Sequence, residues 1–104
     1  MVKNKLLIAV DIDDTLAKGQ YWGKEELEPI QEMIDLVNDL YIRGHHIIIH
    51  TARKEWWRTA TEKWLQDNKI HYHALVMNKL PADYYIDDKA ITPKEIKEFI
   101  IKHL

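Results

Sequence analysis

The chain contains no cysteine among its 104 residues. A disulfide framework, a thiolate metal site and a cysteine nucleophile are therefore excluded, and the composition fits a reducing compartment. Glycine and proline are scarce, with three of each, and no repeat or low-complexity tract occurs. These residues act as local punctuation and form no linker, so we interpret residues 1–104 as a single domain.

Long hydrophobic runs are also missing. The apolar run from Leu6 to Val10 follows Lys3 and Lys5, but it is shorter than the roughly 7–15 residues of a signal-peptide core. No stretch approaches the ~20 apolar residues of a membrane span. The formal net charge of -2 gives no overall attraction to nucleic acid or anionic membranes. We therefore expect a cytoplasmic protein without a membrane partner.

Short apolar runs that alternate with amphipathic segments make up most of the chain. Four runs predict strands at residues 6–10, 47–49, 74–77 and 84–86, and the first two are apolar enough to be buried on both faces. Helices are expected from Pro29 to Gly44, over residues 54–68 with Ala60 facing inward, and from Thr92 onward, where Thr92 and Glu95 form a capping box. This order predicts an α/β three-layer sandwich with a mostly parallel, Rossmann-like sheet of about four strands.

Polar side chains follow each of the four runs. In open parallel sheets, ligands bind beyond the carboxyl ends of the strands, so these residues should converge on one edge. They are Asp11, Asp13, Asp14 and Thr15 after the first run, His50, Thr51 and Arg53 after the second, Asn78 and Lys79 after the third, and Asp87 and Asp88 after the fourth.

Five carboxylates at one edge need compensation, because unit charges ~4 Å apart repel by about 4 kcal/mol at an effective dielectric near 20. Magnesium takes oxygen ligands and suits a carboxylate-rich site without cysteine better than zinc does. A carboxylate nucleophile, a divalent cation, a lysine and a hydroxyl together favour phosphoryl transfer. A second carboxylate nearby can protonate the leaving group and then activate water.

The four groups resemble the four motifs of the haloacid dehalogenase superfamily, in the correct order and over nearly the whole chain. Asp11-Ile12-Asp13-Asp14-Thr15-Leu16 looks like the first motif, Ile49-His50-Thr51 the second, Lys79 the third and Ile86-Asp87-Asp88 the fourth. The resemblance implies Asp11 as the nucleophile that becomes an aspartyl-phosphate and Asp13 as general acid/base.

The same resemblance implies the remaining site residues. Mg²⁺ would be held by Asp11, the Asp13 main-chain carbonyl and either Asp87 or Asp88. Thr51 would bind the transferring phosphoryl group, and Lys79 would neutralise charge. Family members often have proline directly after this lysine, whereas here Leu80 intervenes, so Lys89 is the alternative. Asp14 occupies the variable position of the motif and receives no catalytic role.

A closer resemblance is to small phosphatases of capsule biosynthesis and, more loosely, to the phosphatase domain of polynucleotide kinases. It rests on four stretches, which are His50-Thr51-Ala52-Arg53, Trp64-Leu65, Ile70-x-Tyr72 and Tyr85-Ile86-Asp87-Asp88-Lys89-Ala90. The chain has space for a short flap but none for a cap domain. A capless site is open to large substrates or is closed by a neighbouring subunit of a homo-oligomer. We expect a phosphorylated small molecule as substrate.

Other residues leave alternatives open. Arg53 either binds substrate phosphate or pairs with an acid, and Trp56 either stacks a base or sugar ring or packs on the surface. With Lys54 and Arg58, these residues motivate a second hypothesis, a 3′-phosphatase on nucleic-acid ends, although the net charge opposes it. A third is a non-catalytic, metal-dependent binding module. His71 and His73 show no spacing to further ligands that indicates zinc, and His50 is expected in the helix-packing layer.

Overall fold

A computed structural model describes residues 5–96 and 98 as a small α/β fold. Within these residues three parallel strands lie in the order β1 (Leu7–Val10), β2 (His46–His50) and β3 (Ala74–Val76). Helices α1 (Gln31–Ile42) and α2 (Arg58–Asp67) connect them, and a short 3₁₀ turn, η1 (Glu55–Trp57), precedes α2. Three of the four predicted strands and the parallel sheet are confirmed.

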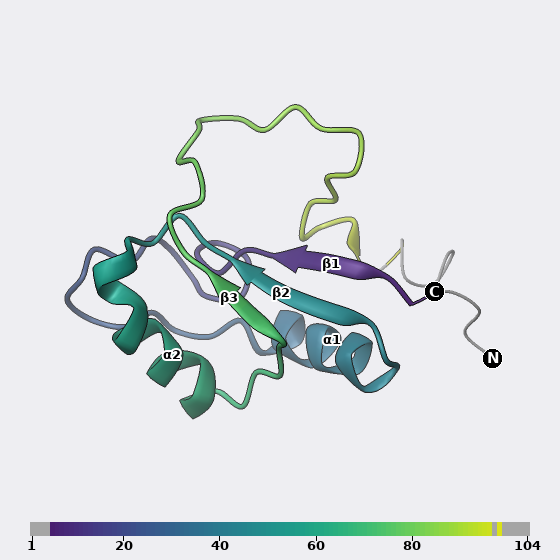
Figure 1. Cartoon of the computed structure of the whole chain (residues 1–104), viewed down its shortest axis with the longest axis horizontal. Helices are drawn as coiled ribbons and strands as arrows, with labels where there is room; N and C mark the ends of the chain where they lie inside the picture. Colours follow the sequence, from purple (N-terminus) through teal and green to yellow (C-terminus); the bar gives the residue numbers. More distant parts are fainter. Residues whose placement is uncertain (1–4, 97, 99–104) are drawn as a thin grey trace.

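One face of the sheet forms the core with the helices. Val10, Ile49 and Leu75 are neighbours in the strand register, and the first two are buried. On the other face, Leu7 is 72% exposed, so β1 is not buried on both faces as predicted. Figure 1 shows α1 and α2 on the same side of the strands. The described residues therefore form one strand layer and one helix layer.

Helix α1 ends as its sequence predicts. Gly44 adopts a left-handed φ of +97°, which a Cβ would disfavour, and its N–H donates to the Tyr41 carbonyl at 3.0 Å. The His45 N–H reaches the Leu40 carbonyl at 3.1 Å. These two bonds satisfy carbonyls at the helix end and turn the chain directly into β2.

The second predicted helix is divided between η1 and α2. Its inward face includes Trp64 and Leu65, as predicted, but Ala60 is exposed and Thr61 is buried in its place. Thr61 lies three and four residues before Trp64 and Leu65, so these three residues share one face of α2.

The predicted strand at residues 84–86 does not form. Tyr84 and Ile86 are largely or fully exposed, and Figure 1 shows residues 78–91 arching away from the strands on the side opposite α1 and α2. A strand of three residues is stable only with a hydrogen-bonded neighbour, and this segment has none among the described residues.

The start of the last predicted helix shows half of its capping box. The Glu95 carboxylate accepts from the Thr92 N–H at 3.3 Å and from the Thr92 hydroxyl at 2.6 Å. The inward positions Phe99 and Ile100 lie outside the described residues. No helix in the described part of the chain is long and apolar enough to cross a membrane.

Candidate active site

Backbone hydrogen bonds within the loop that follows β1 hold this loop in a compact turn. The Ile12 carbonyl accepts hydrogen bonds from the N–H groups of Thr15, Leu16 and Ala17 at 2.8–3.1 Å, and the Ile12 and Leu16 side chains are fully buried. These anchors leave the side chains of Asp11 and Asp13 at the carboxyl end of the strand. The alternation of apolar and acidic residues in the sequence thus builds the edge of the site.

Asp14 stabilises this loop. Its φ is +60°, a region that aspartate and asparagine tolerate, and its carboxylate accepts from the Gly19 N–H at 2.9 Å and from Gln20 Nε2 at 2.6 Å. The side chain therefore closes the turn.

Asp11 lies among other charged groups. Burial raises the pKa of its carboxyl above the ordinary value, and the nearby Asp13 carboxylate acts in the same direction. The Ile12 N–H, which donates to Asp11 Oδ1 at 2.8 Å, and the side chains of Lys79 and His50 lower this pKa. His50 alternates with the core-facing Ile49 of β2, so it lies off the helix face and acts on Asp11, contrary to the sequence prediction.

Thr51 and Lys79 are joined through their backbones at the ends of β2 and β3. The Lys79 N–H donates to the Thr51 carbonyl at 2.8 Å, and the Thr51 N–H donates to the Val76 carbonyl at 2.9 Å. The Thr51 side chain is buried, and its hydroxyl accepts from the Arg53 N–H at 3.1 Å. The Lys79 ammonium lies 4.4 Å from the centre of the Tyr85 ring.

Of the two predicted candidates for the third motif, Lys79 is the one near Asp11, the predicted nucleophile. It lowers the pKa of Asp11, whereas the Lys89 N–H donates to Asp87 Oδ1 at 2.9 Å within the exposed segment. Asp11, Asp13, Thr51 and Lys79 therefore gather at the carboxyl edge of the sheet, as the strand order predicts.

Arg53 is buried, with a side chain that is fully inaccessible to solvent. Its Nε and Nη2 donate to Asp13 Oδ1 at 3.1 and 3.0 Å, and its guanidinium carbon lies 4.3 Å from the centre of the Tyr21 ring. Of the two roles left open by the sequence, the structure shows pairing with an acid. Each of its three guanidinium nitrogens donates to a protein acceptor, so the group that would bind a substrate phosphate is already occupied.

The flap, residues 18–28, closes over this ion pair. Its base is an antiparallel bridge between Ala17 and Pro29, and the Tyr21 N–H donates to Asp13 Oδ2 at 3.0 Å. The Tyr21 ring packs edge-on against Trp57, with centroids 5.2 Å apart. The flap is therefore attached both to the predicted acid and to the start of α2.

Two tryptophans beside this contact face solvent. Trp22 of the flap and Trp56 of η1 are each 77% exposed, and the Trp56 ring lies 6.3 Å from that of Trp57. Trp57 packs against the flap, whereas Trp56 projects into solvent, and both roles suggested for Trp56 by the sequence stay predictions. For Trp22, in the flap, the sequence leaves the same two roles open as for Trp56.

Asp87 and Asp88 are not brought to this edge. Both lie in the exposed segment 78–91, where the Lys89 N–H lowers the pKa of Asp87. Within residues 5–96 and 98, no group of three or more acidic or histidine side chains is arranged to hold a metal ion. The predicted contribution of the fourth strand to the site is absent because that strand does not form.

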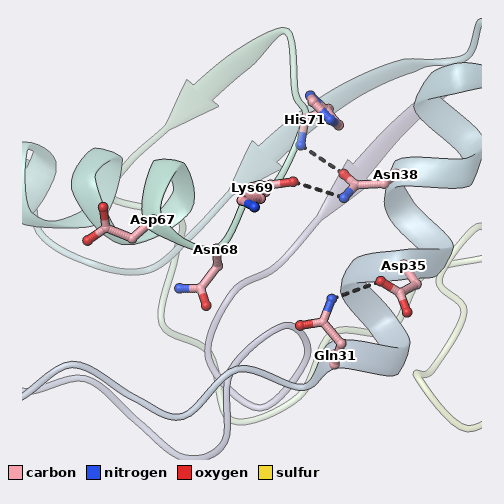
Figure 2. A pocket seen from close by; sticks show the side chains of 7 residues that line it. All are labelled: Gln31, Asp35, Asn38, Asp67, Asn68, Lys69 and His71. Atoms are coloured by element: carbon pink, nitrogen blue, oxygen red, sulfur yellow. Dashed lines mark hydrogen bonds between the residues drawn. The ribbon is translucent and has the colours of Figure 1, made fainter.

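A polar hollow of about 390 Å³ lies elsewhere, between α1 and the end of α2 (Figure 2). Asn38 spans it, donating to the Lys69 carbonyl at 2.9 Å and accepting from the His71 N–H at 2.8 Å. The Asn38 amide thus ties the chain before β3 to α1. The residues that line the hollow are Gln31, Asp35, Asn38, Asp67, Asn68, Lys69 and His71. None of them is predicted as functional from the sequence.

Comparison with known proteins supports the fold. A crystal structure of a target protein from Vibrio cholerae superposes with a TM-score of 0.74 at 23% sequence identity, covering 93% of this chain and 94% of that one. No family model matches the chain, and no curated protein matches it. At this identity the likeness shows a shared fold and nothing about activity.

Proposed function

We propose that this chain is a magnesium-dependent phosphomonoesterase of the haloacid dehalogenase type, with a flap in place of a cap domain. The proposal rests on one observation. Four residues lie together at one edge of the sheet, on segments that follow three different strands, and they are Asp11, Asp13, Thr51 and Lys79. These residues match the motifs of that superfamily in kind and order. The substrate is a sugar phosphate, a nucleotide or another phosphate ester.

In this proposal Asp11 attacks phosphorus and forms an aspartyl-phosphate as the ester P–O bond breaks. Asp13 gives its proton to the departing ester oxygen, then takes a proton from the water that attacks phosphorus and restores Asp11. Lys79 neutralises charge beside Asp11, in line with its effect on the Asp11 pKa. The Thr51 hydroxyl oxygen already accepts a hydrogen bond, and its proton can be donated to a phosphoryl oxygen.

The donors present fit magnesium in kind. A carboxyl group whose pKa is raised by burial and by a second carboxylate is stabilised in its charged form by a hard cation, and magnesium often uses only one or two carboxylates with waters and substrate oxygens. Asp11 and the Asp13 carbonyl would hold the ion, which when bound neutralises phosphoryl charge. Asp87 or Asp88 could join them only after segment 78–91 moves toward β1.

The proposal is tested by hydrolysis of p-nitrophenyl phosphate in magnesium. Asp11→Asn should abolish turnover while the far-ultraviolet circular dichroism is unchanged. Asp14→Asn is the matched control, because it makes the same chemical change in the same loop, keeps an acceptor for the Gly19 N–H and tolerates the positive φ. Undiminished turnover in Asp11→Asn, or equal loss in both variants, contradicts the assignment.

The alternative of a 3′-phosphatase on nucleic-acid ends loses part of its motivation. Arg53 is inaccessible, and Arg58 donates to Glu55 at 2.6 Å and to the Leu75 carbonyl at 3.3 Å. Of the three basic residues that suggested a phosphate-backbone contact, Arg53 is enclosed, and Arg58 is paired with Glu55 although its side chain is 37% exposed. Exposed Trp56 suits a small ring-bearing ester as well as a nucleotide in a strand.

A further inference from the structure

Arg53 is the most completely enclosed charged side chain in the described part of the chain. It lies three positions past the end of β2, yet its contacts come from the β1 loop, the flap and α2. A buried cation is costly unless it is paired and hydrogen-bonded, so this arrangement needs an explanation beyond packing.

The contacts converge on Asp13. Arg53 Nε and Nη2 both donate to Oδ1, at 3.1 and 3.0 Å, and the Tyr21 N–H donates to Oδ2 at 3.0 Å. Each carboxylate oxygen of Asp13 therefore accepts from a different residue. A rotation of the Asp13 side chain away from this orientation breaks charge-assisted hydrogen bonds, which are the strongest kind in proteins.

The rest of the guanidinium is fixed as well. Arg53 Nη1 donates to Thr61 Oγ1 at 3.2 Å and lies 3.5 Å from Glu26 Oε1. Its planar face covers the Tyr21 ring at 4.3 Å and lies 5.9 Å from the Trp64 ring. Arg53 therefore cannot move with a substrate, and its orientation is dictated by α2 and the flap.

We propose that Arg53 is a positioning residue for the proton-transfer chemistry of Asp13, and that it links this carboxyl to the flap through Tyr21. This inference rests on the proposed phosphatase function. Arginine does not lose its proton in proteins, so Arg53 acts through Asp13 and not as an acid itself. Arg53 holds Oδ1, and Oδ2 lies beside the flap, where it accepts from the Tyr21 N–H.

Two esters distinguish this role from a merely structural one. p-Nitrophenolate departs from phosphorus without protonation, whereas the alkoxide of glycerol 2-phosphate needs a proton from the general acid. Arg53→Lys keeps the charge but cannot present two donors in a fixed fork. We expect its kcat/KM on glycerol 2-phosphate to fall on the order of 10- to 100-fold further than on p-nitrophenyl phosphate, since a positioned acid contributes about 10²–10⁴-fold.

Asp13→Asn and Thr61→Val provide the controls. In the Asp13→Asn background the comparison uses single-turnover rate constants for the first step, the release of alcohol or phenol from each ester. There Arg53→Lys should leave the ratio of the two rate constants unchanged, because the group it positions is gone. Thr61→Val removes one hydrogen bond to the guanidinium but leaves both of its hydrogen bonds to Asp13, so it should shift the ratio far less than Arg53→Lys does. A shift in the ratio by Thr61→Val as large as that by Arg53→Lys would overturn the positioning role.

The remaining outcomes separate this inference from the proposed function. If the wild type hydrolyses both esters in an Asp11-dependent way but Arg53→Lys lowers both equally, the positioning role is wrong and the phosphatase stands. If the wild type hydrolyses neither ester, both are wrong.

A measurement on folded protein keeps the test decisive should Arg53→Lys not fold. The Arg53 Nε–H resonance should be protected from exchange, and it should shift in Asp13→Asn but not in Glu26→Gln, which alters the more distant 3.5 Å partner of Nη1. An Nε–H resonance that Asp13→Asn leaves in place overturns the inference.

Discussion

The contact between the flap and Trp57 yields a prediction with a matched pair of variants. Gly19 and Gly23 have similar left-handed φ values, +90° and +85°, so alanine at either position costs about 1–2 kcal/mol of backbone strain. At Gly19 an added Cβ meets nothing within 4 Å. At Gly23 it would lie 2.8 Å from Trp57 Nε1 and 3.0 Å from two ring carbons, which adds about 1–3 kcal/mol of overpacking.

We therefore expect Gly23→Ala to destabilise the protein by about 1–3 kcal/mol more than Gly19→Ala, measured by urea unfolding followed through tryptophan fluorescence. If the flap detaches without global unfolding, the same energy appears as faster hydrogen exchange of the Tyr21 amide, about tenfold for each 1.4 kcal/mol. That amide donates to Asp13 Oδ2, so Gly23→Ala should also reduce the proposed phosphatase activity more than Gly19→Ala does.

Equal effects of the two variants on unfolding, on Tyr21 exchange and on activity would refute this reasoning. Such a result would mean that Trp57 does not restrain the flap, and that the flap does not restrain Asp13.

Three further predictions concern charge, packing and metal binding. The pKa of Asp11 is raised in the folded state, so the contribution of this carboxyl to the free energy of unfolding is favourable at low pH and is lost as the pH rises through the folded pKa. Asp11→Asn has no such pH dependence, so its stability relative to the wild type should be higher at neutral pH than below pH 3.8. Thermal melts without magnesium measure this difference. Leu65→Ala, at a fully buried position of α2, should cost about 2–5 kcal/mol in urea unfolding, whereas Leu80→Ala, at a site 71% exposed, should change stability by less than about 0.5 kcal/mol. Magnesium at about 100 times its Kd should stabilise the wild type by about 2.7 kcal/mol and should not stabilise Asp11→Asn. The same measurement on Asp87→Asn and Asp88→Asn identifies the further ligand, because the variant that lacks this ligand loses the stabilisation.

The parts of this site that the sequence predicts are those that depend on short-range patterns. Short apolar runs mark β1 and β2, and the polar residues directly after them, Asp11 and Thr51, fall at the same sheet edge because parallel strands end together. Gly44 ends α1 because only a residue without a Cβ adopts its φ at no cost. In each case the physical cause lies within a few residues.

The parts that the sequence does not predict depend on partners distant in the chain. Arg53 pairs with acids 27 and 40 residues before it, and nothing near Arg53 in the sequence shows that these acids are close enough to bury it. The run Tyr84-Tyr85-Ile86 has the composition of a strand, but composition does not supply the neighbour on which a strand depends. His50 was assigned to the wrong layer because the helices cover only the face opposite to it in the described residues.

Trapping the covalent intermediate tests the central claim most directly. Asp13→Asn should react with p-nitrophenyl phosphate in magnesium to release one equivalent of p-nitrophenol per protein and then stall, because the base that activates water is missing. Acid quenching and peptide mass spectrometry should then find one phosphoryl group on Asp11, and none when Asp11→Asn is added. A stoichiometric burst with the phosphoryl group on another residue, or steady turnover with no covalent phosphoryl group on Asp11, would contradict the account.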